Sequence, residues 1–107
     1  MVWIEGRRIR ISRGDTARIR IEMEDGGRLE GAQAVVTVKR RPGDGEALLA
    51  RTATVEAGCV EVALGAGETE RAPGIYWWDL RLVMPDGGVQ TPFEPEVFEI
   101  CEVVGDV

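Results

Sequence analysis

Acidic side chains gather in two stretches, and they are the first residues whose chemistry could matter. The stretches comprise Asp44 and Glu46 in one loop, and Glu94, Glu96, Glu99 and Glu102 near the C-terminal end. Calcium takes ~6–8 oxygen ligands from a compact loop, and neither stretch has the alternating Asp-x-Asp arrangement of such a loop. Their spacing also gives no support to hydrolysis by a pair of carboxylates. We therefore predict solvated carboxylates and no metal site.

Histidine is absent from the chain, and the two cysteines are Cys59 and Cys101. The absence of histidine removes the commonest general base and the commonest metal ligand together. It excludes zinc sites built from histidine and cysteine, and every catalytic triad that uses histidine. The cysteines are expected to be free thiols, with a bridge between them as the alternative. We predict no catalytic residue, no cofactor and no small-molecule substrate, so the protein is not expected to be an enzyme.

Arg13-Gly14-Asp15 spells the tripeptide that integrins recognise, but short matches of this kind often arise by chance. A turn explains the three residues better, because glycine relieves backbone strain and an aspartate side chain can accept a hydrogen bond from a nearby amide. Thr16 then opens the strand that follows. We therefore predict a structural turn at this position.

Four arginines could form a basic stripe on one outer face, namely Arg8, Arg10, Arg18 and Arg20. A nucleic-acid site would also need interleaved aromatic side chains and a basic chain, whereas the formal net charge here is −6. We predict that the stripe pairs with carboxylates on neighbouring strands or on neighbouring subunits.

The charges divide unevenly along the chain. Residues 1–53 carry 11 basic and 8 acidic side chains, a net charge of +3, and residues 54–107 carry 2 and 11, a net charge of −9, which together give −6. Two interpretations stay open. In one, the two halves neutralise each other inside one fold; in the other, positive and negative surfaces let copies of the protein stack on each other.

The elements that position these residues are strands, and the clearest is Gly74–Met84. It alternates along its length, and residues 85–88 then turn the chain into a second strand. The predicted inward set is Tyr76, Trp78, Leu80, Leu82 and Met84, and the outward set is Trp77, Asp79, Arg81 and Val83. One face is apolar and the other mostly polar, as in a sheet packed on one side only.

Six further segments have strand character, whereas only a short stretch around Glu68 could form a helical turn. The segments are Arg8–Ile11, Thr16–Met23, Gln33–Arg40, Leu48–Val55, Cys59–Leu64 and Glu96–Val103. Asp25-Gly26-Gly27 is expected to form a tight turn between two of them. About seven short strands with turns every ~8–12 residues predict an all-β protein, an antiparallel β-sandwich forming one domain over residues 1–107.

Tyr76 lies at the start of a late strand, directly after a segment that must cross between the sheets. Sandwich domains often place a tyrosine there, with its hydroxyl bonded to the crossing backbone. The alternative is an ordinary core tyrosine at a strand end.

The order of turns and strands resembles a known family over roughly residues 8–104. The matching elements are Gly14-Asp15-Thr16, Asp25-Gly26, a strand ending in Lys39, the apolar strand 60–64, Gly74-x-Tyr76-x-Trp78-Asp79-Leu80, Asp86-Gly87 and Phe98-x-Ile100. The chain resembles the immunoglobulin-like domain at the N-terminus of phage baseplate upper proteins, and related phage and prophage structural proteins. The longer tail proteins of this kind continue into further domains. The resemblance implies an immunoglobulin-like sandwich in the virion, without catalysis or cofactor.

The expected function is therefore that of a structural or assembly protein of a phage or prophage virion, associated with the tail or baseplate. A fibronectin-type binding or adhesion module, for a carbohydrate or a cell-surface partner, is the alternative. The N-terminus lacks the basic and apolar segments of a signal peptide, and no apolar run approaches the ~20 residues that span a bilayer. We expect a virion component made in the host bacterial cytoplasm, with no membrane or nucleic-acid partner.

The partners expected are copies of the chain itself, other virion proteins, or both. Trp77 is placed on an outward face, where tryptophan is uncommon, and tryptophan is enriched at interaction hot spots. It could form an interface or be covered within its own subunit by the loop 41–46 or by Trp3. The predicted interface residues are Trp77, Val83, Trp3, Arg18 and Arg20, in a homo-oligomer of modest affinity.

Overall fold

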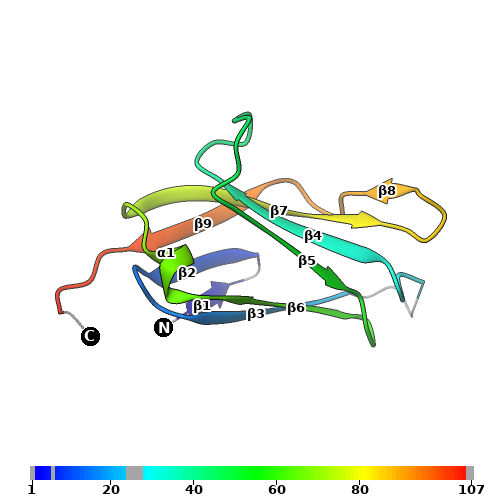
Figure 1. Ribbon diagram of the computed structural model, residues 1–107, viewed down its shortest axis with the longest axis horizontal. Coiled ribbons are helices and arrows are strands. Elements are labelled where there is room, and N and C mark those ends of the chain that lie inside the picture. The colour runs from blue at the N-terminus through cyan, green and yellow to red at the C-terminus, as the bar shows by residue number, and fades with distance from the viewer. Residues whose placement is uncertain (1, 6, 24–27, 106–107) are drawn as a thin grey trace.

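Nine strands and one short helix form the part of the chain that the computed structural model describes, residues 2–5, 7–23 and 28–105 (Figure 1). The elements are β1 (Val2–Glu5), β2 (Arg8–Ser12), β3 (Ala17–Glu22), β4 (Gln33–Lys39), β5 (Leu49–Thr54), β6 (Cys59–Leu64), α1 (Ala66–Thr69), β7 (Gly74–Val83), β8 (Val89–Gln90) and β9 (Glu96–Cys101). Of β1 only the backbone is described. The tight turn predicted at Asp25-Gly26-Gly27 lies outside the described residues.

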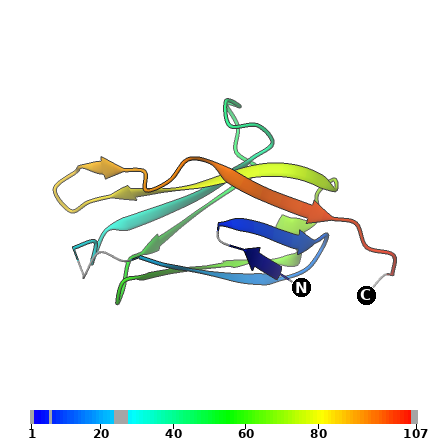
Figure 2. The same ribbon diagram turned by 180° about the vertical axis from the view of Figure 1, so that it is seen from behind.

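The strands form two layers, and the fold is an immunoglobulin-like β-sandwich. The larger sheet has the order β1-β2-β9-β7-β4-β5, with β8 beside the end of β7, and β3 pairs with β6 in the smaller sheet. Figures 1 and 2 show β3 and β6 as a separate layer facing β7, β4 and β5. The buried apolar core lies on the inner faces of the two layers, so the layers must pack against each other to remove those faces from water.

The predicted β-sandwich is confirmed, and two details of its strands differ from the expected antiparallel arrangement of about seven strands. First, β2 pairs with β9 in parallel, with Ile9 opposite Phe98 and Ile11 opposite Ile100. These strands lie at opposite ends of the chain, and alternation along each one does not reveal which neighbour it will have or in which direction. Second, β1 was not among the predicted strands, and the strand predicted after the 85–88 turn, β8, pairs with β7 over only two residues.

The core follows the predicted alternation closely. On β7 the side chains of Tyr76, Trp78, Leu80 and Leu82 are buried, and Met84, just beyond the strand, is half-buried. The other buried strand residues are Ile9, Ile11, Ile19, Ala34, Val36, Val38, Cys59, Val60, Val62, Leu64, Phe98 and Ile100. Three residues of the predicted strand Thr16–Met23 are less buried than expected. Ala17, Ile21 and Met23 are half-buried and pack against the core.

The crossover from β6 to β7 contains the predicted helical turn, α1, and a buried polar side chain that sequence reasoning did not single out. The amide nitrogen of Gly65 donates to Glu68 Oε1 at 2.8 Å, which closes the first turn. Thr69 is 1% exposed, and its Oγ1 lies 2.6 Å from the carbonyl oxygen of Asp15. Since the amide nitrogen of Gly14 donates to the carbonyl oxygen of Thr69 at 3.3 Å, α1 is fastened to the turn between β2 and β3.

Tyr76 forms the hydrogen bond from its hydroxyl to the crossing backbone, which is the first of the two interpretations of its position in the sequence. Its hydroxyl donates to the carbonyl oxygen of Ala72 at 2.6 Å, four residues upstream, while its ring is buried. The bond fixes the end of the crossover to the start of β7.

Replacing Tyr76 by phenylalanine should lower the free energy of unfolding by about 0.5–1.5 kcal/mol, the net value of one hydrogen bond, because the ring stays packed and the exposed Ala72 carbonyl can bind water. Urea denaturation of both proteins measures the difference. An unchanged midpoint would contradict a stabilising role for the bond.

Candidate interaction surfaces

Apolar side chains on the outer face of the larger sheet form one candidate surface. Ile75 and Trp77 of β7 share this face, and the register places Trp77 between Val97 of β9 and Lys39 of β4. Ile75 is 39% exposed, and Trp77 and Val97 are half-buried. Trp77 thus points outward as predicted, and its side chain is half-buried and not fully exposed. We name Ile75, Trp77 and Val97 the β7 patch.

Val83 belongs to a second apolar spot on the same face and does not extend the β7 patch. It is 39% exposed and lies opposite Val89 of β8, which is 51% exposed. Asp79 and Arg81 lie between Val83 and Trp77 along the strand, and Arg81 donates to the hydroxyl of Thr91. The expected single patch of Trp77 and Val83 is therefore divided by a polar stretch.

The remaining predicted interface residues lie elsewhere in the fold. Arg18 and Arg20 are on the outer face of β3, in the other layer of the sandwich, so they share no surface with Trp77. The backbone of Trp3 is opposite Arg10 in the pairing of β1 with β2, and its side chain lies outside the described residues. The five predicted residues are thus distributed over four places, since Trp77 and Val83 belong to separate spots on β7.

The four arginines do not form one stripe, because Arg8 and Arg10 lie on β2 of the larger sheet and Arg18 and Arg20 lie on β3 of the smaller one. Three of them pair with carboxylates on neighbouring strands, as predicted, whereas Arg20 pairs with Glu22 of its own strand at 3.4 Å. Arg8 and Arg10 approach the same carboxylate oxygen of Glu99 on β9, at 3.4 and 3.2 Å. Arg18 reaches Glu61 on β6 at 2.9 Å. These pairs join the basic N-terminal half to the acidic C-terminal half within one molecule, which supports mutual neutralisation inside the fold.

The Arg13-Gly14-Asp15 turn is also held by hydrogen bonds and ion pairs within the molecule. Gly14 has a φ of +82°, and the amide nitrogen of Asp15 donates to the carbonyl oxygen of Ser12 at 3.0 Å. Arg13 contacts Glu70 and lies 2.7 Å from Glu102 through its Nε. The backbone amide of Val103 and the Arg13 guanidinium together lower the pKa of Glu102. The prediction of a structural turn is confirmed.

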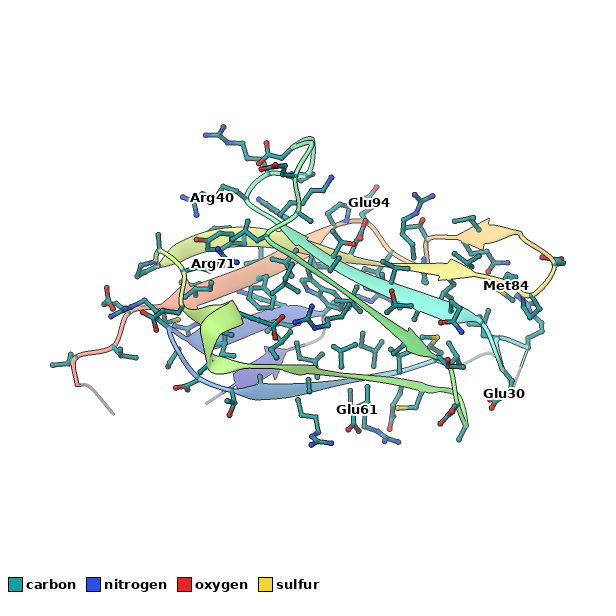
Figure 3. The ribbon with its side chains drawn as sticks, viewed as in Figure 1. Glu30, Arg40, Glu61, Arg71, Met84 and Glu94 are labelled. Carbon is teal, nitrogen blue, oxygen red and sulfur yellow. The ribbon has the colours of Figure 1, made fainter. Side chains whose placement is uncertain are left out.

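The other carboxylates are spread over the surface. Figure 3 shows Glu61 projecting from the smaller layer and Glu94 lying beside the larger one. Among the residues described, no group of three or more histidine, cysteine, aspartate or glutamate side chains could hold a metal ion. The two cysteines are free thiols, Cys59 buried and Cys101 half-buried.

A pocket of about 740 Å³ opens between the two layers and is the feature that sequence reasoning missed. Its apolar wall includes Ile19, Ile21 and Trp78, and its rim carries Arg7, Arg20, Glu22 and Glu96. Because β3 has a partner strand on one side only, the smaller sheet does not cover the inner face of the larger one there. No sequence signal reveals this opening, since it depends on which strands pair.

Phe93 and Arg7 close one end of the pocket. The Phe93 ring packs edge-to-face on Trp78 with 5.2 Å between ring centroids, and the Arg7 guanidinium carbon is 4.6 Å from the centre of the Phe93 ring. Trp78 Nε1 donates to the carbonyl oxygen of Arg7 at 2.7 Å. The pocket therefore has an apolar interior and a charged rim, which suits an apolar chain segment with polar flanks.

No helix within the described ranges combines the length and the apolar character that a membrane crossing requires.

Comparisons with known proteins bear on the fold. No protein-family model matches the chain, and no curated protein matches it in sequence. Among solved structures, the soluble domain of PmoD from Methylocystis sp. is similar, with a TM-score of 0.59, 13% identity, and coverage of 92% of this chain and 86% of that one. At this identity the likeness is one of fold alone.

Two further structures are more distant. The natural killer cell receptor NKp44 has a TM-score of 0.48 and 16% identity, over 88% of this chain and 94% of that one. A glycoside hydrolase from Bacteroides vulgatus, described as putative, has a TM-score of 0.47 and 7% identity, over 89% of this chain and 16% of that one. None of these three is a phage baseplate protein.

Proposed function

We propose that the protein is a non-enzymatic structural module of a phage or prophage virion, in the tail or baseplate, and that it works by assembling with copies of itself. The observation that carries assembly is the β7 patch, where a tryptophan and two aliphatic side chains remain partly open on the outer face of a sheet. The order of turns and strands in the sequence supports the virion setting.

The β7 patch is suited to a contact of modest affinity. Burying it against a second surface would remove apolar area from water at about 25 cal/mol per Å². Tryptophan is enriched among the residues that dominate binding energy, particularly where neighbouring contacts exclude water. Lys39 and Glu99 flank the patch on the adjacent strands, so charges at its rim can set orientation.

Replacing Trp77 by glutamate should leave the monomer folded, because the side chain is not part of the buried core, but should shift the protein toward monomer. A buried, unpaired carboxylate in the contact would disfavour association strongly. Light scattering over a concentration series measures the average mass of both proteins.

Thr52→Glu is the matched control, since it adds the same charge to the same face at an exposed position on β5. It should associate like the wild type. If Trp77→Glu associates as the wild type does, the β7 patch is not the contact. A wild type that is monomeric throughout would remove self-assembly and favour the adhesion-module alternative.

A further inference from the structure

The edge of β3 that faces away from β6 has no partner strand among the described residues. The amide nitrogen of Met23 donates to the carbonyl oxygen of Gly58, its opposite residue on the β6 side, at 2.8 Å. In an antiparallel pair, hydrogen-bonded residues alternate with residues whose backbone groups point the other way. The N–H and C=O groups of Arg20 and Glu22 therefore point to the free edge, where a further strand can bind them.

The side chains along this edge are apolar toward the pocket and charged toward solvent. Ile21 and Met23 line the pocket and are half-buried, whereas Ile19 on the same face is fully buried. Arg20 and Glu22 occupy the opposite face and are exposed. The apolar surface left open on β3 is thus greatest beside the residues whose backbone groups are free.

We propose that β3 pairs with β3 of a second copy, antiparallel and across a two-fold axis at Ile21. In this register Arg20 lies opposite the partner's Glu22 and Glu22 lies opposite the partner's Arg20. Their free backbone groups face each other as hydrogen-bonded pairs, and their side chains are oppositely charged.

On the inner face the same register brings apolar side chains together. Ile21 meets the partner's Ile21, and Met23 meets the partner's Ile19, so the half-buried residues of each copy are covered by the other. The smaller sheets then form one continuous sheet in the order β6-β3-β3-β6, and an isologous contact of this kind closes as a dimer.

The free edge of β6 does not offer the same contact. Glu61 is the charged residue on its outer face between Cys59 and Ala63, so antiparallel pairing with a second β6 supplies no opposite charge. The described lining of the pocket also contains no residue of β6. Of the two edges of the smaller sheet, as far as the structure describes them, the β3 edge combines self-complementary charge with open apolar surface and the β6 edge does not.

The β3 edge adds a second surface to the proposed assembly function and uses no residue of the β7 patch. The two surfaces lie on different layers, so substitutions at one should leave the other intact. A pair of short strands is smaller than the ~1,200 Å² typical of stable complexes, and we expect a dimer that forms between about 10 µM and 1 mM.

Arg20→Pro tests the pairing without disturbing β6. The proline removes an N–H that points to the free edge, and proline is tolerated on edge strands in that orientation. Arg20→Ala is its matched control, because it removes the same side chain and keeps the N–H. Sedimentation equilibrium should show at least a tenfold weaker dimer for Arg20→Pro than for Arg20→Ala. Equal association of the two variants would overturn the proposal.

Charge reversal provides the second test, and it decides the matter if Arg20→Pro fails to fold. Glu22→Arg alone puts like charges opposite each other at both ends of the pairing, and Arg20→Glu alone does the same. Each should weaken the dimer by about tenfold at low salt, and the double variant Arg20→Glu/Glu22→Arg should restore it. If the double variant is no better than the singles, or if Trp77→Glu alone abolishes association, the β3 dimer is wrong while the β7 patch can still stand.

Discussion

Trp78→Ala should lower the free energy of unfolding by about 3–5 kcal/mol, the usual cost of truncating a buried aromatic side chain. The indole is 3% exposed on the inner face of β7, between β4 and β9. Its loss would remove the ring contact with Phe93 and leave the Arg7 carbonyl oxygen without its donor. Small domains have only about 5–15 kcal/mol of stability, so this variant should unfold or aggregate readily.

Trp78→Phe and Trp77→Ala serve as controls in the same urea-denaturation series. Trp78→Phe keeps most of the apolar volume and loses the N–H donor, so it should be clearly more stable than Trp78→Ala. Trp77→Ala truncates the neighbouring, half-buried ring and should cost much less than Trp78→Ala. A Trp78→Ala protein that melts within a few degrees of the wild type would show that the two faces of β7 are reversed.

Thr69→Val should lower the free energy of unfolding by about 1–3 kcal/mol, although valine fills nearly the same volume. The change removes the hydroxyl that donates to the part-buried carbonyl oxygen of Asp15 at 2.6 Å, and valine supplies no donor in its place. Because this bond fastens α1 to the turn between β2 and β3, exchange of nearby amide protons should also become faster.

Thr69→Ser is the matched variant, since it keeps the hydroxyl and loses a methyl group. Its loss of stability should be smaller than that of Thr69→Val when both are measured by urea denaturation. The reverse order would show that the methyl group, and not the hydrogen bond, is what stabilises this crossover.

Alternation along single strands accounts for most of what the sequence predicts correctly. The inward residues of β7 are an example, because a side-chain period of two follows from strand geometry alone. The short helix near Glu68 and the turn at Gly14 can be predicted equally well from the sequence, since both depend on local backbone preferences.

Pairing between distant strands could not be predicted in the same way. The parallel contact of β2 with β9 joins the two ends of the chain, and nothing in the sequence of either strand indicates which strand it pairs with. Trp77 has Lys39 of β4 and Val97 of β9 as its neighbours only because β7 lies between these two strands in the sheet. The sequence therefore predicts the outward face of Trp77 correctly, but it leaves open how much of the ring is covered within the subunit.

The candidate surfaces show the same limit. Arg18 and Arg20 were grouped with Trp77 by residue type, whereas the two layers of the sandwich keep them apart. The open edge of β3 and its pocket arise because one sheet has fewer strands than the other, and strand number per sheet is a property of the whole fold. The sequence shows the opposite charges of Arg20 and Glu22, but it does not show that they lie at an unpaired strand edge.

Sedimentation equilibrium of the wild-type protein, from about 10 µM to 1 mM at low salt, tests the central claim that this chain acts by self-association. We predict that the average mass rises with concentration above that of the monomer, and that added salt reduces the rise because opposite charges orient the contacts. A single monomeric species over the whole range would contradict the claim.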